Sequence, residues 1–184
     1  MLVLASSSPQ RRAMLERLGV AFLQRPSGVA ELELGDPGAI ALENALRKAR
    51  AAVAPGANEA VLGCDTLVAL RGVVYGKPAD ETAARETLRA LSGATHEVLS
   101  GLALLIEGSP ARTALARTAV TFRVLGEDLL DWYLARGEWR GRAGGYAIQG
   151  AGAALVRSVD GDYENVVGLP LATLLDLYPE LLSG

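Results

Sequence analysis

The sequence predicts an α/β fold in which a mixed, twisted sheet carries flanking helices and two lobes enclose a central cleft. Apolar runs typical of strands alternate along the chain with segments of helical spacing. Two long apolar runs, 95–106 and 113–124, flank turn residues 107–110 and predict an antiparallel hairpin, which makes the sheet mixed. No linker-like stretch interrupts the chain, so residues 1–184 are expected to form one domain, with this hairpin separating its two lobes.

Local signals support the individual elements. Residues 2–4 are apolar and predict a buried strand, and Ser8 and Pro9 are typical of the N-cap and first turn of a helix that Gly19 ends. The other helices are expected at residues 36–54, 80–91, 127–136 and 170–178. The other strands are expected at residues 60–70, 73–75, 95–106, 113–124 and 153–159, and the glycine-rich residues 137–152 are expected to form a loop.

Composition limits the classes of function. Hydrophobic residues make up 50% of the chain and charged residues 21%, which fits a globular protein. The net charge of −3 gives no electrostatic basis for nonspecific binding of nucleic acid, and no apolar run is long enough to span a bilayer. We therefore expect neither nucleic acid nor membrane as a partner. The first residues lack the positive region of a signal peptide, and a single cysteine suits a reducing compartment, so a cytoplasmic location is expected.

The segment from Leu2 to Arg12 carries the first chemical signal. A strand leads through three serines into a helix that has Arg11 and Arg12 in its first turn. Free N–H groups at a helix start attract anions, and arginine there opposes the helix dipole unless an anion is bound. The segment indicates a phosphate site, and an N-capped helix with solvated arginines is the alternative.

Three charged residues further along also indicate a site. Asp65 lies inside a strongly apolar strand, where a carboxylate needs a partner or a metal, unless it caps a local turn at a strand end. Lys77 lies in a rigid Gly-Lys-Pro turn and can serve as a point charge for phosphate, with an ordinary surface turn as the alternative. Lys48 has small alanine neighbours, so its ammonium can reach a cleft or extend along a solvated face.

Weaker signals concern a metal and a nucleobase. Glu31 and Glu33 precede the second helix, and with Asp65 they could hold a divalent cation by oxygen ligation, although the spacing is no fixed metal motif. Gln149 lies between glycines, where its amide could bind a base edge or its own backbone.

Several other enzyme classes lose support. His96 is the only histidine, and no Gly-x-Ser-x-Gly motif accompanies it, so His96 is interpreted as structural. Cys64 is interpreted as a buried core thiol. No Walker sequence and no Gly-x-Gly-x-x-Gly motif occurs, which disfavours ATPase and dinucleotide-binding functions.

Seven stretches span nearly the whole chain: LASSSPQRR (4–12), LENALRKARA (42–51), LGCDTLVAL (62–70), GKP (76–78), LSGATHEVLSG (91–101), GGYAIQG (144–150) and GDYENVVGLPL (161–171). In this order they resemble the Maf family of nucleoside triphosphate pyrophosphatases. The resemblance implies a Maf / ITPase-like fold, commonly a homodimer, that cleaves a nucleoside triphosphate to the monophosphate and pyrophosphate with a divalent cation, usually Mg²⁺ or Mn²⁺. Asp65 matches the family's catalytic aspartate, and the phosphate- and metal-site positions match Ser6, Arg11, Glu31, Lys48 and Lys77.

Three residues resemble the branch of the family that acts on dTTP and UTP. This chain has Arg11, Thr66 and Gln149 at the positions where the branch acting on 7-methyl-GTP differs. Uracil and thymine present carbonyl acceptors beside an N–H donor, and one amide can bind both. The open alternatives are a 7-methyl-GTP pyrophosphatase, an enzyme acting on modified pyrimidine triphosphates, and a nucleotide-binding regulator of cell division with little catalysis.

One position departs from the family pattern. Gln10 stands where the first of two arginines is usual, and Arg12 lies about 100° further round the helix, so it cannot simply replace that arginine. Either the affinity for triphosphate is lower or another basic residue compensates. Arg47 also stands where Glu or Gln is common, which shifts the charge near the cleft.

Overall fold

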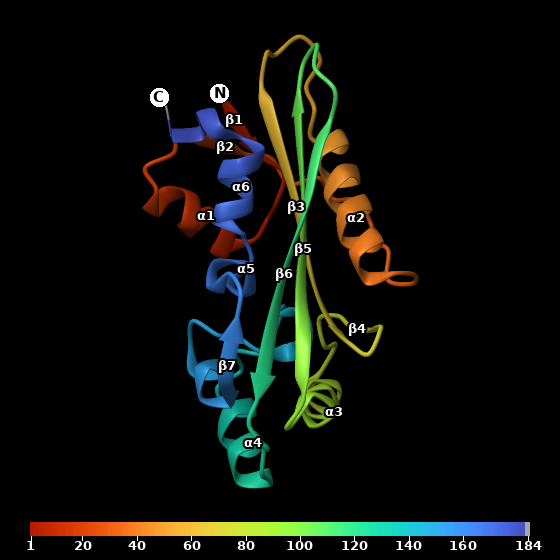
Figure 1. The fold of residues 1–184 in the computed structure, drawn as a ribbon, viewed down its shortest axis with the longest axis vertical. Helices are drawn as coiled ribbons and strands as arrows, with labels where there is room; N and C mark the ends of the chain where they lie inside the picture. The colour runs from red at the N-terminus through yellow and green to blue at the C-terminus, as the bar shows by residue number, and fades with distance from the viewer. Residues whose placement is uncertain (183–184) are drawn as a thin grey trace.

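One mixed sheet forms the centre of the structure, a computed structural model that describes residues 1–182 (Figure 1). The strands are β1 (Leu2–Leu4), β2 (Phe22–Gln24), β3 (Ala60–Leu70), β4 (Val73–Tyr75), β5 (Thr95–Ile106), β6 (Arg112–Phe122) and β7 (Val156–Asp160). Their order is β2-β1-β3-β5-β6-β7, and β4 pairs with β3 outside this path. β1 runs parallel to β2 and β3, whereas the other pairs are antiparallel. The predicted mixed sheet of an α/β fold is therefore confirmed.

Helices cover both faces of this sheet. The α-helices are α1 (Pro9–Arg17), α2 (Pro37–Ala51), α3 (Glu81–Leu91), α4 (Glu127–Leu134), α5 (Tyr163–Val167) and α6 (Leu171–Leu177), and short 3₁₀ segments are η1 (Ala143–Gly145), η2 (Ala151–Leu155) and η3 (Pro179–Leu182). Figure 1 shows α2 on one face of the long strands and α1 with α6 on the other, at the end where both termini lie. α3 and α4 lie at the opposite end of the long strands.

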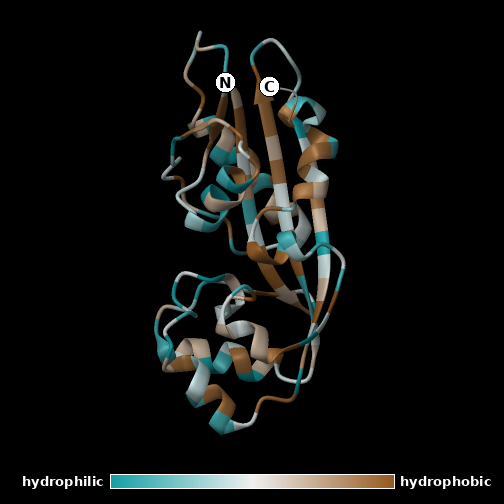
Figure 2. Cartoon of the chain, turned by 90° about the vertical axis from the view of Figure 1, so that its left-hand side faces the viewer, coloured by the Kyte–Doolittle hydropathy of each residue, from teal (hydrophilic) through white to brown (hydrophobic). Residues whose placement is uncertain are grey.

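The two faces of the sheet pack against helices through side chains of different size. Large apolar side chains fill the α1 and α6 face, among them Leu15 from α1 and Leu174 from α6. Small side chains fill the α2 face, where Ala45 and Ala49 pack against β1, β3 and β5. Figure 2 shows hydrophobic residues along the long strands and mixed polarity along the helices. Among residues 1–182, no helix is both long enough and apolar enough to cross a membrane.

Two glycines bring α2 unusually close to the sheet. A Cβ at Gly63 of β3 would lie 2.0 Å from the carbonyl oxygen of Ala45, and a Cβ at Gly101 of β5 would lie 2.2 Å from that of Ala41. Any larger residue at either position would therefore push the helix away from the strands. This close approach brings the inward face of α2 against the middle of β3, where Asp65 lies.

The sequence did not predict β2 and α5, and it misplaced several boundaries of other elements. β2 and α5 have three and five residues, too few for a periodic pattern, and their place in the fold comes from tertiary contacts. The strand expected at 153–159 was wrong at its start, because Ala151–Leu155 forms a 3₁₀ turn and the strand begins at Val156. Other ends shift slightly: α2 ends at Ala51, β6 covers Arg112–Phe122, α4 ends at Leu134 and α6 covers Leu171–Leu177.

Candidate active site

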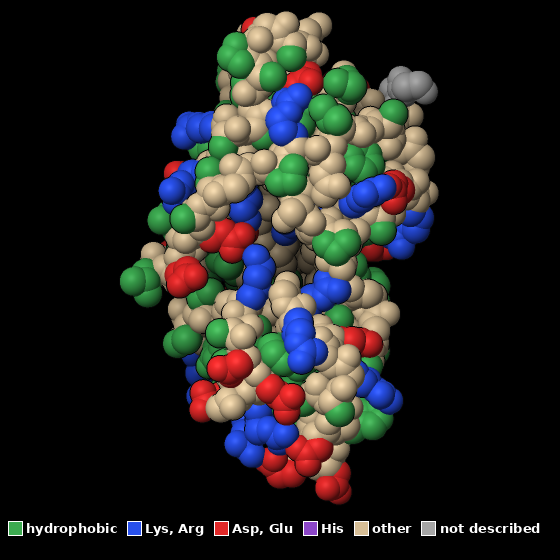
Figure 3. Space-filling view, turned by 180° about the vertical axis from the view of Figure 1, so that it is seen from behind, with side chains coloured by type: hydrophobic (Ala, Val, Ile, Leu, Met, Phe, Trp, Pro, Cys, Tyr) green, Lys and Arg blue, Asp and Glu red, His purple; other side chains and the backbone are tan. Residues whose placement is uncertain are grey.

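The candidate site lies beside an opening in the edge of β3. On that edge β1 pairs only with residues 60–62 and β4 only with residues 68–70, so no strand of residues 1–182 pairs with residues 63–67 on this side. A cavity of about 420 Å³ opens there, and this size suits a small-molecule ligand. Figure 3 shows a hollow in the middle of the molecule with Lys and Arg side chains around it. Eight of the site residues predicted from the sequence line the cavity: Ser6, Arg11, Glu31, Lys48, Asp65, Thr66, Lys77 and Gln149.

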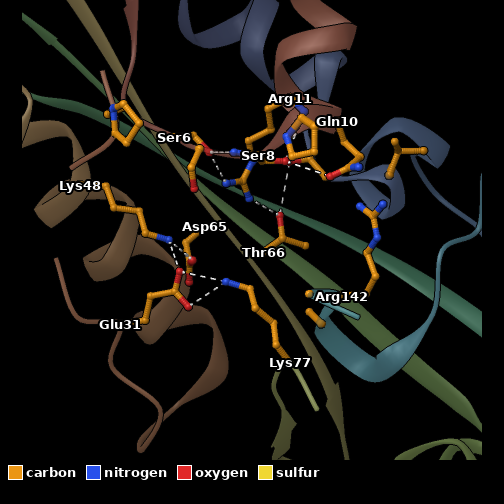
Figure 4. A pocket seen from close by; sticks show the side chains of 18 of the residues that line it. Ser6, Ser8, Gln10, Arg11, Glu31, Lys48, Asp65, Thr66, Lys77 and Arg142 are labelled. Carbon is orange, nitrogen blue, oxygen red and sulfur yellow. Dashed lines mark hydrogen bonds and ion pairs between the residues drawn. The ribbon is translucent and has the colours of Figure 1, made fainter. Parts of the chain in front are cut away.

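Asp65 and Thr66 are neighbours in β3 but lie on opposite faces of the sheet, because successive side chains of a strand alternate. Asp65 faces α2 and contacts Lys48, whereas Thr66 faces α1 and contacts Arg11 (Figure 4). Since the strand edge is open here, both side chains reach the same cavity. The cavity therefore has two chemically distinct walls.

We call Glu31, Lys48, Asp65 and Lys77 the carboxylate wall. The Lys48 ammonium donates to Asp65 Oδ1 at 2.5 Å and to Glu31 Oε1 at 2.6 Å. Lys77, which is more exposed, donates to both Glu31 oxygens at 3.4 Å. Asp65 is only 3% exposed and Lys48 8%. Burying a carboxylate is costly without a cation partner, and Lys48 supplies that partner.

The electrostatics of Glu31 follow from its two lysine neighbours. Partial burial by itself would raise the pKa of Glu31, but the hydrogen bond and charge of Lys48, together with Lys77, outweigh it and hold that pKa below its ordinary value. Glu31 is therefore an anion at neutral pH, and the wall presents two carboxylates and two ammonium groups.

Sequence reasoning missed Asn44, which ties this wall together. The Asn44 side chain is 1% exposed and donates to Asp65 Oδ2 at 3.0 Å. It also accepts from the Leu32 N–H at 2.7 Å and donates to the Leu32 carbonyl at 3.1 Å, which fixes the loop that carries Glu31. Its position four residues before Lys48 on α2 was a usable signal, because residues at that spacing share one helix face.

We call Ser6, Arg11, Thr66 and Gly168 the arginine wall. The Arg11 guanidinium donates to the Gly168 carbonyl at 2.8 Å, to Thr66 Oγ1 at 3.0 Å and to Ser6 Oγ at 3.1 Å. The hydroxyls of Thr66 and Ser100 lie 2.7 Å apart, which fixes the threonine from the other side. Arg11 is 8% exposed, and all three of its acceptors are neutral. Its positive charge is thus uncompensated beside the cavity.

The start of α1 behaves as its sequence predicts. Ser8 caps the helix by accepting from the Arg11 N–H, and Pro9 occupies the first turn. Ser8 Oγ donates to the side-chain oxygen of Gln10 at 3.2 Å, so Gln10 is held against its own helix start. Arg12 is exposed and pairs with Glu16 outside the cavity, as the helical rotation between adjacent residues requires.

The loop around Gln149 borders both walls. Gln149 is exposed at the cavity, and no hydrogen bond to another residue of 1–182 holds its side chain. The loop itself is anchored, because the Ala147 N–H donates to the Tyr133 hydroxyl at 3.1 Å and the Tyr146 hydroxyl lies 2.9 Å from His96 Nε2. Arg142, at the start of the same loop, also lines the cavity and was missed, because a glycine-rich loop gives no pattern that singles out one arginine.

The expected carboxylate triad for a metal does not form. Glu33 is exposed and does not line the cavity, so the prediction that Glu31, Glu33 and Asp65 share a cation was wrong for Glu33. Within residues 1–182, no three His, Cys, Asp or Glu side chains gather closely enough to hold a metal by themselves. Glu31 and Asp65 are neighbouring carboxylates, joined through Lys48.

His96 and Cys64 are core residues. His96 is 1% exposed and packs edge-on against Phe122, and burial lowers the pKa of its imidazole to about 4. Cys64 is fully buried, and burial raises the pKa of its thiol, which makes the thiol unreactive. Neither residue lines the cavity, which agrees with the structural interpretation of both.

Comparison with known proteins shows which family this chain resembles. The model of the family described as "Maf-like protein" matches residues 1–181. A Pyrococcus furiosus protein named "dTTP/UTP pyrophosphatase" is 42% identical over 96% of this chain and 93% of its own length. A Moorella thermoacetica protein of the same name is 48% identical over 96% of this chain and 92% of its own length. A solved structure of the Staphylococcus aureus Ham1 protein aligns with 66% of this chain and 71% of that one at 15% identity and a TM-score of 0.47, which is too distant to support conclusions about activity.

Proposed function

Because the chain belongs to the Maf family, we propose that it is a nucleoside triphosphate pyrophosphatase that hydrolyses dTTP and UTP to the monophosphate and pyrophosphate. One observation carries the proposal: a buried, cation-paired Asp65 carboxylate opens into a cavity with four cationic and two anionic side chains. A local excess of positive charge on a chain of net charge −3 suits a small polyanionic substrate. The two relatives named above support the choice of dTTP and UTP.

Asp65 is the general base in this proposal. The oxygen of a water molecule attacks the α-phosphorus, and the bond from that phosphorus to the bridging oxygen breaks. Pyrophosphate leaves with the bonding electron pair, and Asp65 accepts the proton that the water loses. Lys48 and Asn44 hold one carboxylate oxygen each, so the base keeps a fixed orientation while each oxygen retains a lone pair for the water.

The cations of the cavity neutralise the triphosphate. Lys48 and Lys77 approach from the carboxylate wall, and Arg11 approaches from the arginine wall with the Ser6 hydroxyl beside it. Positive charge that is already in place lowers the barrier, because the developing negative charge needs no reorganisation of solvent. Phosphoryl transfer depends mostly on such positioning and charge.

The donors present fit a hard divalent cation such as Mg²⁺ or Mn²⁺. Glu31 and Asp65 both accept from the same Lys48 nitrogen, so their oxygens face a common point. Protein sites for Mg²⁺ usually supply one or two carboxylates and take further oxygens from substrate phosphates. We assign Glu31 and Asp65 as the residues that would hold the ion. When bound, it would neutralise phosphate charge and stabilise the leaving pyrophosphate.

Thr66 and Gln149, with Arg11, select the pyrimidine. The free side-chain amide of Gln149 offers one donor group and one acceptor, which match an N–H and a carbonyl on the edge of uracil or thymine. Three further assignments remain proposals. The chain forms one domain with two lobes and assembles as a homodimer. It works in the cytoplasm, a reducing compartment that its single, buried cysteine suits.

A panel of nucleoside triphosphates tests the proposed function. Purified protein with Mg²⁺ is incubated with each nucleotide in turn, and the pyrophosphate released is measured. We expect release from dTTP and UTP and little from 7-methyl-GTP or the other common triphosphates. Release from 7-methyl-GTP instead would retain Asp65 as the base but overturn the specificity. Nucleotide binding without release would contradict the enzymatic proposal and favour a regulatory protein.

A further inference from the structure

Among the cations that line the cavity, Arg142 is the one without a partner in the described part of the chain. Lys48 and Lys77 pair with Glu31, and Arg11 has three acceptors, but no carboxylate among residues 1–182 lies within ion-pairing distance of Arg142. Its Nε is buried and lacks any hydrogen-bond partner within the described chain. A buried guanidinium nitrogen without an acceptor is costly, and a bound anion would remove that cost.

The backbone that carries Arg142 is fixed before any ligand arrives. The Arg142 N–H donates to the Trp139 carbonyl at 3.2 Å, and its own carbonyl accepts from Gly145 at 3.0 Å. Gly144 has φ +68°, and its N–H donates to the Gly76 carbonyl at 3.1 Å, which ties the loop to the residue before Lys77. A Cβ at Gly144 would meet Val68 at 2.8 Å, so the tight contact requires glycine there. The guanidinium therefore projects from a rigid support.

The position of Arg142 decides which part of the substrate it can contact. Figure 4 shows Arg142 on one side of the cavity and Lys48 with Asp65 on the other, with Arg11 and Thr66 between them. In the proposed reaction the α-phosphate lies beside Asp65, which leaves Arg142 to contact a group further along the substrate. The nucleoside is uncharged, whereas the outer phosphates are anionic and match the forked guanidinium.

We propose that Arg142 binds the outer phosphates of the nucleotide, the part that leaves as pyrophosphate. This inference rests on the proposed function, because that reaction sets the α-phosphate beside Asp65. It adds a phosphate ligand on the side of the cavity where Gln10, which is uncharged, lines the start of α1. Inorganic pyrophosphate contains only the group that Arg142 contacts, and UMP contains only the rest of the substrate, so the two compounds separate this role from any other.

Calorimetric binding of inorganic pyrophosphate and of UMP tests the proposal. The variants are Arg142→Gln, which removes the charge, and Arg142→Lys, which keeps the charge but cannot donate two parallel hydrogen bonds as a guanidinium does. Arg140→Gln is the matched control, because Arg140 is exposed two residues earlier and stacks on Trp139 outside the cavity. We expect Arg142→Gln to weaken pyrophosphate binding about 10- to 100-fold, as for a lost hydrogen bond to a charged group, and Arg142→Lys to fall between Arg142→Gln and the original protein.

UMP binding is the internal control for an intact cavity. We expect its affinity to be unchanged in both Arg142 variants and in Arg140→Gln. Pyrophosphate binding by Arg142→Gln equal to that of the unaltered protein would overturn the proposal, and so would an equal loss of pyrophosphate and UMP binding. If the unaltered protein hydrolyses no triphosphate but Arg142→Gln still selectively loses pyrophosphate, the proposed function fails and the anion site stands.

Discussion

The two walls of the cavity hold their cations in opposite ways. On the carboxylate wall, Lys48 lies 2.5 Å from Asp65 and 2.6 Å from Glu31, so two carboxylates share its charge. On the arginine wall, Arg11 bonds only to neutral oxygens and keeps its charge available. A paired cluster suits proton transfer because it fixes a carboxylate, whereas an unpaired guanidinium suits anion binding. The difference indicates that chemistry and affinity are divided between the two faces of β3.

Removing the cation from the carboxylate wall should have the largest effect on stability. Lys48→Met leaves Glu31 and the buried Asp65 without their shared partner, and breaking a buried pair costs about 3 kcal/mol or more. Denaturant unfolding at neutral pH measures the loss. Arg50→Met on the exposed side of the same helix is the matched control and should change little. Equal losses in the two variants would show that Lys48 is not needed to stabilise the carboxylates.

Removing the charge of the arginine wall should weaken substrate binding more than it slows turnover. Arg11→Gln deletes an uncompensated guanidinium, and we expect the KM for UTP to rise about 10- to 100-fold with a much smaller change in kcat. Arg12→Gln is the control, because Arg12 is the next residue but lies outside the cavity. A variant that lost kcat at unchanged KM would assign Arg11 to the chemical step and contradict the division between the walls.

We expect acid to lower the stability of the fold through His96, which contacts the loop that borders both walls. The pKa of His96 is about 4 in the fold and about 6.5 in an unfolded chain, so between these values the unfolded state binds more protons and stability falls as pH falls. From pH 7 to pH 5 this loss amounts to about 2 kcal/mol. Unfolding of the protein and of His96→Gln at both pH values checks it, since the variant should lose distinctly less. The same loss in both would exclude His96 as the source.

The sequence predicted which residues line the site better than it predicted how they are arranged there. Seven of the eight predicted site residues lie in short motifs whose order along the chain was readable, Glu31 lies outside them, and all eight line one cavity. Strand alternation could have separated Asp65 from Thr66, but their meeting in one cavity depends on β1 and β4 leaving the edge of β3 open between residues 62 and 68. That opening depends on strand pairing over long separations, which local patterns do not encode.

Asn44 and Arg142 were not predicted, and both for the same physical reason. Asn44 acts through hydrogen bonds to Leu32 and Asp65, which are distant in sequence, and Arg142 matters because its buried Nε has no acceptor within residues 1–182. Both properties belong to the folded environment rather than to residue type. Glu33 shows the converse, because its spacing from Glu31 suggested a shared site while the loop turns it outward.

Adjacent residues on opposite walls provide the most direct test of this division. The kcat and the dissociation constant for UTP are measured side by side for Asp65→Asn and Thr66→Val, with the binding measured in the absence of turnover. We expect Asp65→Asn to lose about 100- to 10,000-fold in kcat while UTP still binds, because the base is removed and the cations that bind the phosphates remain. Thr66→Val should keep kcat and bind UTP about 10-fold more weakly, because Arg11 loses an acceptor that orients it. Parallel losses of kcat and affinity in both variants would contradict the division of labour between the two walls.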